Sequence, residues 1–117
     1  GRPVLANCWA TTCTSCTREM PQLVDLYEEL APRGFEIIGI SMAYDPPNHV
    51  LAFKQTRSIP YPLALDIQSL AARAFGDVQL TPSSFLIAPG GRIVHRQTGK
   101  LDMPELRGLI LGMLANN

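Results

Sequence analysis

The sequence has few aromatic residues, no excess of charge and no long apolar run. Phe, Trp and Tyr make up 7% of its 117 residues, and ten Lys and Arg balance ten Asp and Glu. A chain without net positive charge gives no sign of a nucleic-acid or acidic-membrane surface as its target, so no nucleic-acid partner is expected. Its apolar runs are far shorter than the roughly 20 residues that a membrane-spanning helix needs.

Cysteine is also scarce, with three residues, at positions 8, 13 and 16. Three cysteines can form at most one internal bridge, which excludes a scaffold held together by several disulfides. The length suits one domain with a real core, so residues 1–117 are expected to form a single domain. The chain opens without a start methionine or a signal peptide, and an N-terminal signal, anchor or extra strands are expected to be missing from it.

Apolar runs alternate with helical patterns along the chain, as in α/β proteins. The patterns predict strands at residues 4–9, 35–42, 62–65, 84–88 and 92–98, and helices at 13–31, 49–57, 66–75 and after 102. Pro21 predicts a kink in the first helix, and Asp66 and Asp102 are expected to cap the helices that follow them. One face of the last helix is expected to hold its apolar residues, Leu106, Leu109, Ile110, Met113 and Leu114.

Cys13 and Cys16 stand where the first predicted strand passes into the first helix, and their spacing brings both sulfurs to one side of the first turn. First-turn amides have no helical acceptor, and the helix dipole adds positive partial charge. A thiolate at Cys13 is therefore stabilised, and its pKa is expected to lie below the free value of about 8.5. Cys16, one turn deeper, is expected to be less exposed. Cys13 is thus predicted to attack a substrate and Cys16 to resolve the mixed disulfide.

Two other cysteine chemistries do not fit the sequence. A structural zinc site needs a second pair of ligands at knuckle spacing, and the chain has none beyond Cys13 and Cys16. The Pro-x-x-x-Thr-x-x-Cys pattern of thiol peroxidases also fails. The positions three and seven before Cys13 are Ala10 and Ala6, and those before Cys16 are Cys13 and Trp9.

A copper-binding or metallochaperone module is the alternative that stays open, because paired thiolates are soft ligands that suit Cu(I). It lacks an obvious third ligand, for which His95 remains a candidate. His95 and His49 have no Asp or Glu spaced to orient them, so each is otherwise expected to be a surface or half-buried residue.

Two blocks, "VLANCWATTCTSCTREMPQL" and, further along, "LTPSSFLIAPGGRIV", carry a more specific signal. Together they resemble the TlpA/ResA/CcmG branch of the thioredoxin superfamily, the exported bacterial thiol-disulfide oxidoreductases, over essentially the whole chain. The positions that match the family pattern are Asn7, Trp9, Ala10, Cys13, Cys16, Glu19, Pro21, Thr81 and Pro82.

The resemblance implies a thioredoxin-like α/β fold: a central mixed sheet, helices on both faces and an insertion after the second strand-helix unit. It implies an enzyme that reduces disulfides of exported proteins, with cytochrome c maturation as one setting. The expected partners are protein thiols or disulfides and a membrane or soluble electron donor. No cofactor and no metal are expected. The protein is expected to be a periplasmic or other extracytoplasmic monomer, with a membrane anchor, if any, outside residues 1–117.

The resemblance also implies roles for further residues. Glu19 follows Cys16 by one turn; spacing alone favours an ordinary exposed glutamate, whereas the family has an acidic residue here that tunes the thiols. By resemblance, Pro82 is cis and lies beside the cysteine pair, and Thr81 offers backbone groups to an extended substrate by strand addition. Trp9 is expected to support the site as a packing residue under the cysteine loop.

The sequence departs from the family pattern around the sulfurs. Cys8 replaces the usual Phe and is expected to be buried, with no role in exchange. Thr12 replaces the Trp before the first cysteine, so partner specificity is expected to be unusual. The dipeptide Thr14-Ser15 lacks the frequent Pro. This dipeptide sets how well the thiolate is stabilised, and related proteins span about 150 mV, so the direction of electron flow stays open.

Overall fold

The structure is a computed structural model that describes residues 1–115. Its elements in chain order are β1 (Val4–Trp9), α1 (Thr14–Leu30), a 3-10 turn (Ala31–Arg33), β2 (Glu36–Ser41), α2 (Pro47–Arg57), β3 (Leu63–Leu65), α3 (Leu70–Ala74), β4 (Ser83–Ile87), β5 (Ile93–Thr98) and α4 (Met103–Ala115). The strands form one sheet in the order β3-β2-β1-β4-β5. The β1, β2 and β3 strands are parallel, whereas β4 runs antiparallel to β1 and β5, so the sheet is mixed as expected.

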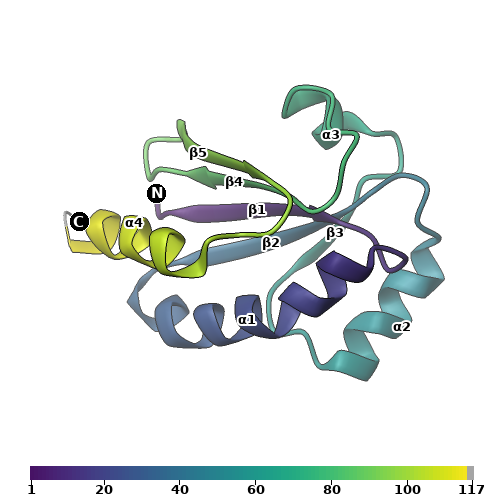
Figure 1. Cartoon of the computed structure of the whole chain (residues 1–117), viewed down its shortest axis with the longest axis horizontal. Coiled ribbons are helices and arrows are strands. Elements are labelled where there is room, and N and C mark those ends of the chain that lie inside the picture. Colours follow the sequence, from purple (N-terminus) through teal and green to yellow (C-terminus); the bar gives the residue numbers. More distant parts are fainter. Residues whose placement is uncertain (116–117) are drawn as a thin grey trace.

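Side chains of the central strand β1 alternate between two cores. Leu5 and Trp9 lie in the larger core, which α1, α2 and α4 cover, while Ala6 and Cys8 lie in a smaller core under α3. Figure 1 shows α3 on one side of the sheet and α1 and α2 on the other. Helices therefore lie on both faces, as predicted, and the strand that leads to the cysteines is held from both sides.

The long helix α1 buries one stripe and exposes the other, as its sequence predicts. Its core side carries Met20, Leu23, Leu26 and Leu30, while Asp25, Glu28 and Glu29 are exposed. Pro21 lies inside the helix without ending it, and the predicted kink there remains a prediction. The chain leaves the 3-10 turn at Gly34, whose φ of 108° lies in the left-handed region that suits glycine.

The helix expected over residues 66–75 is shorter than predicted. It begins at Leu70, because Ser69 has a φ of 58°, outside the right-handed helical region. The helix therefore cannot include Ser69 or extend to the residues before it. Asp66 still serves this helix: its two carboxylate oxygens accept hydrogen bonds from the N–H groups of Ala71 and Ala72, both at 2.9 Å. The capping role is confirmed, although the acid lies outside the helix.

The last helix, α4, is capped as predicted, since Asp102 Oδ1 accepts a hydrogen bond from the Glu105 N–H at 3.1 Å. The prediction of its apolar face is partly wrong. Leu106 and Ile110 are buried, but Leu109 is 38% exposed. The exposed Arg107 of this helix forms a salt bridge with Glu29, which ties α4 to α1.

Candidate redox site

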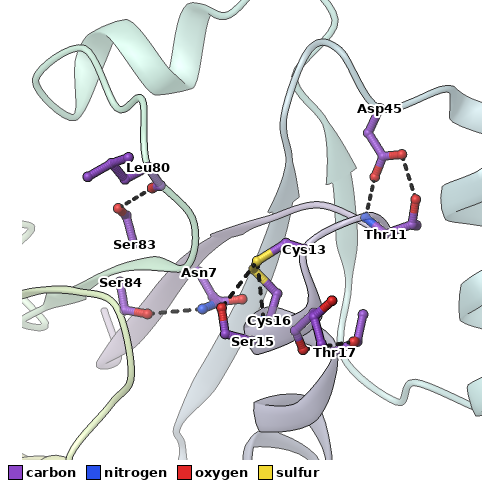
Figure 2. Close-up of a disulfide and its surroundings, with 11 residues drawn as sticks. Asn7, Thr11, Cys13, Ser15, Cys16, Thr17, Asp45, Leu80, Ser83 and Ser84 are labelled. Atoms are coloured by element: carbon purple, nitrogen blue, oxygen red, sulfur yellow. Dashed lines mark hydrogen bonds between the residues drawn. A yellow bond between two sulfur atoms is a disulfide. The ribbon is translucent and has the colours of Figure 1, made fainter.

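Cys13 and Cys16 form a disulfide at the beginning of α1, with a Cα–Cα distance of 5.2 Å. Cys13 is the N-cap residue of the helix, with extended backbone, and its Sγ accepts a hydrogen bond from the Cys16 N–H at 3.2 Å. Ser15 Oγ lies 3.7 Å from the same sulfur. Figure 2 shows these groups converging on Cys13 Sγ. The helix therefore presents an unused first-turn amide to this sulfur, as expected for a group that stabilises a thiolate.

The two sulfurs differ in exposure. Cys16 is only 3% exposed and belongs to the larger core, whereas Cys13 is half-buried. The expectation that Cys16 is the less exposed cysteine is confirmed. Around them Thr12, Thr14 and Ser15 are exposed, so a partner would meet small neutral side chains beside the disulfide. The lowered thiol pKa expected for reduced Cys13 remains a prediction.

The loop before Cys13 is held by a contact that the sequence analysis missed. Asp45 lies after β2 and is almost fully buried. Its Oδ2 accepts a hydrogen bond from the Thr11 N–H and its Oδ1 one from Thr11 Oγ1, both at 2.7 Å (Figure 2). A carboxylate with two donors on one residue fixes the loop firmly. No local pattern indicates this contact, because the two residues are 34 positions apart.

The Thr81–Pro82 peptide bond is cis, as the resemblance implies. The pairing of Cys8 with Ser83 places this bond at the end of the sheet where β1 leads towards Cys13. Ser83 Oγ donates a hydrogen bond to the Leu80 carbonyl at 2.6 Å and so fixes the segment before the bond. Among residues 1–115, the Thr81 backbone has no hydrogen-bond partner.

Glu19 is buried, contrary to what spacing alone favours. It is 5% exposed, and its Oε2 accepts a hydrogen bond from the Leu101 N–H at 2.7 Å. Burial raises the pKa of this carboxyl group, while the Leu101 hydrogen bond and the charge of Lys100 oppose the rise. The other oxygen, Oε1, has no hydrogen-bond partner within the described part of the chain. A buried acid with one free oxygen lies one turn from Cys16, on the side of α1 that faces the core.

Cys8 and Trp9 have the structural roles expected of them. Cys8 is fully buried, and burial, with the nearby charge of Asp66, raises the pKa of its thiol to about 11. A thiol in that state supplies almost no thiolate at neutral pH. Trp9 is also fully buried and packs against the Phe53 ring at a centroid distance of 5.3 Å. Trp9 is therefore a packing residue of the larger core, and the support of the cysteine loop expected of it remains a prediction.

The structure does not bring His95 to the sulfurs. His95 pairs with Leu86, and Leu86 pairs with Leu5, which is four residues, roughly 13 Å along a strand, before Trp9. Its Nε2 lies 3.3 Å from Glu105 Oε1, so the expectation that no carboxylate orients it is wrong. The partner was missed because it lies on a helix across the fold.

A copper site gains no support from the other metal-binding side chains either. Within residues 1–115, no group of three or more His, Cys, Asp or Glu residues is placed to hold a metal ion. His49, the other histidine, is exposed on α2.

Known proteins share this fold. The AhpC/TSA family model matches residues 1–96. The chain belongs to the AhpC/TSA family. Belonging to this family does not make the chain a thiol peroxidase candidate again. The residues before Cys13 and Cys16 lack the Pro and Thr of the Pro-x-x-x-Thr-x-x-Cys pattern.

Individual proteins that resemble the chain give a more specific comparison than the family model does. The chain is 30% identical to the thiol-disulfide oxidoreductase ResA of Geobacillus thermodenitrificans over 107 residues, which are 92% of this chain and 60% of that protein. It therefore spans about three-fifths of the length of this curated relative. A candidate thioredoxin of Neisseria meningitidis superimposes with a TM-score of 0.93 at 26% identity, covering 100% of this chain and 77% of that one.

StoA of Bacillus subtilis, at 19% identity, shares the fold with a TM-score of 0.81 over 92% of this chain and 81% of that one. These relatives confirm the resemblance to the TlpA/ResA/CcmG branch of the thioredoxin-like proteins. Across residues 1–115, no helix has the length and apolar character needed to cross a membrane.

Proposed function

We propose that this protein is a thiol-disulfide oxidoreductase and that Cys13 and Cys16 are its reacting groups. The observation that carries the proposal is the Cys13–Cys16 disulfide at the start of α1, with the Cys16 N–H donating to the more exposed sulfur. The likeness to ResA, a thiol-disulfide oxidoreductase, supports it.

In the reducing direction, the Cys13 thiolate attacks one sulfur of a substrate disulfide. A bond forms between that sulfur and Cys13 Sγ, and the second substrate sulfur leaves as a thiolate that takes up a proton. The Cys16 thiol then loses its proton and attacks Cys13 Sγ, which releases the first substrate sulfur as a thiol. Two electrons pass from the cysteine pair to the substrate, and the Cys13–Cys16 disulfide remains. An electron donor must reduce it before the next cycle.

Thr81 and Pro82 form the substrate-binding edge in this proposal. An extended peptide adds to the free backbone groups of Thr81, and Pro82, which has no N–H, shapes the groove. Glu19 supports the reaction as a buried carboxyl group that exchanges protons near Cys16 and acts on the thiols through its charge. Trp9 supports the loop by packing.

We further propose that the protein works as a monomeric single domain outside the cytoplasm and reduces cysteines of exported proteins. Cytochrome c maturation is one setting that the resemblance to the TlpA/ResA/CcmG branch implies. The proposed partners are protein thiols or disulfides and a membrane or soluble electron donor. Neither nucleic acid nor a cofactor takes part.

Insulin reduction and a redox equilibrium with glutathione test the proposal. The wild-type protein should accelerate insulin reduction by dithiothreitol, and the Cys13→Ser variant should not. The equilibrium gives the reduction potential of the pair: a strongly oxidising value would overturn the reductase direction. Tight stoichiometric binding of Cu(I) by the reduced protein, without any exchange activity, would replace the enzyme by a copper-binding module.

A further inference from the structure

The helix that carries the sulfurs and the edge that holds Thr81 and Pro82 are linked through one short segment. Glu19, on α1, accepts the Leu101 N–H at 2.7 Å, although the two residues are 82 positions apart. Two residues earlier in the chain, the Gly99 N–H donates to the Pro82 carbonyl at 2.7 Å. Segment 99–101 thus joins the two sides of the proposed groove with one hydrogen bond at each end.

Both ends of this link are well fixed. Glu19 and Leu101 are buried, at 5% and 4% exposure, so water does not compete for their hydrogen bond. Gly99 has a φ of 86°, a left-handed conformation that lets its N–H extend the β4–β5 ladder by one bond to Pro82. A shift of the Glu19 carboxylate would therefore reach Pro82 through only the three residues of segment 99–101.

We propose that Glu19 is a positioning residue, which through segment 99–101 fixes the spacing between the Cys13–Cys16 pair and the Thr81–Pro82 edge. The inference rests on the proposed function, because it assigns that edge to the substrate. It is separate from a charge effect on the thiols: positioning needs only an acceptor oxygen for the Leu101 N–H, whereas thiol tuning needs the carboxylate charge. The two roles are therefore separable by substitution.

Glu19→Gln and Glu19→Leu separate the acceptor from the charge. Gln keeps an oxygen that can accept the Leu101 N–H but has no charge, and Leu lacks both. Gly99→Ala disturbs the other end of the link, since alanine is strained at this φ, and leaves Glu19 unchanged. Gly91→Ala is its matched control. Gly91 has a similar φ of 96° and equally open surroundings, but it lies in the β4–β5 turn at the far end of the sheet.

The readouts are KM and kcat for a disulfide-bonded peptide, and the rate with oxidised glutathione, which is too small to need the whole groove. We expect Glu19→Leu and Gly99→Ala to raise KM for the peptide by roughly three- to tenfold and to affect glutathione less. Glu19→Gln should keep KM within about twofold of wild type while its pH profile changes. Gly91→Ala should match wild type in both assays.

Peptide KM values for Glu19→Gln as high as for Glu19→Leu would overturn the positioning role, as would wild-type KM in Gly99→Ala. Amide hydrogen exchange gives a reading that does not depend on activity. The Leu101 and Gly99 amides should exchange faster in Glu19→Leu than in Glu19→Gln, and equal protection would count against the link. If Glu19→Leu does not fold, Glu19→Gln and Gly99→Ala decide the matter. A wild-type protein inactive towards both substrates would instead overturn the proposed function.

Discussion

The N–H of Cys16 points at Cys13 Sγ from 3.2 Å, across the same turn that the disulfide closes. When the disulfide is reduced, this amide is the donor already in place for a thiolate on Cys13. Within residues 1–115, Cys16 Sγ accepts no equivalent hydrogen bond, and Cys16 lies in the core. The helix start therefore makes the two cysteines unequal before any partner arrives.

The first prediction assigns the attacking and resolving sulfurs. Cys13→Ser should reduce disulfide exchange to the uncatalysed rate, because the sulfur that a partner can reach is gone. Cys16→Ser should instead accumulate a mixed disulfide between Cys13 and the substrate, because no second thiol can resolve it. Intact-mass measurement after incubation with a disulfide-bonded peptide detects this adduct. An adduct that forms as readily in Cys13→Ser, on Cys16, would reverse the assignment.

The second prediction concerns the third cysteine. Because burial raises the pKa of the Cys8 thiol to about 11, iodoacetamide at pH 8 should label reduced Cys13 first and leave Cys8 unmodified while the protein stays folded. Peptide mapping by mass spectrometry identifies the labelled positions. Labelling in denaturant is the control, since Cys8 should then react like the other two. Rapid labelling of Cys8 in the folded protein would contradict its assignment to the core.

Features that depend on neighbouring residues were predictable from the sequence. The Cys13–Cys16 spacing fits one helical turn, and the strand before it and the helix after it have clear apolar periods. The β4–β5 hairpin likewise follows from two β-rich runs and a glycine turn, in which Gly91 has a φ of 96°. In each case, the residues that decide the structure are adjacent in the chain.

Features that depend on distant residues, or on a backbone conformation that the residue type does not favour, were not predictable in the same way. Glu19 is buried with a hydrogen bond from Leu101, 82 positions away, whereas the helical period alone favours an exposed glutamate. The α3 helix starts late because Ser69 adopts a left-handed φ, to which serine has no special preference. The cis Thr81–Pro82 bond came from family resemblance, since a sequence with ten prolines does not single one out.

The third prediction follows from the buried Glu19. Burial raises the pKa of its carboxyl group, so the folded protein binds this proton more tightly than the unfolded chain does. The free energy of unfolding should therefore fall as pH rises from the ordinary pKa of about 4.5 through the raised value. Gln does not titrate, so Glu19→Gln should lose this dependence. Its stability relative to wild type should increase with pH across that window.

Urea unfolding of both proteins at several pH values between 4 and 8 checks this prediction. The comparison needs the same ionic strength at each pH, so that only protonation changes. A stability of Glu19→Gln relative to wild type that stays constant, or that decreases as pH rises, would contradict a raised pKa at Glu19.

The last prediction concerns the Asp45–Thr11 clamp, the two hydrogen bonds that hold the loop before Cys13. Asp45→Ala removes both acceptors of Thr11 and leaves its N–H without a partner, so it should destabilise the protein by about 1–3 kcal/mol. Thr11→Val removes only the hydroxyl bond and should cost about 0.5–1.5 kcal/mol. Because both changes remove the Oγ1–Oδ1 hydrogen bond, the double variant should be less destabilised than their sum. Asp25→Ala, an exposed change on α1, is the control and should stay within about 0.5 kcal/mol of wild type.

The clamp should also act on the reaction, because Thr11 lies two residues before Cys13. A looser loop gives Cys13 more conformations, so fewer molecules present the sulfur to the Cys16 N–H at any moment. Asp45→Ala should therefore slow insulin reduction several-fold at a temperature where the variant is fully folded, which thermal unfolding establishes beforehand. If the folded variant keeps the wild-type rate, Asp45 stabilises the fold alone, and the arrangement of Cys13 depends on its own helix turn.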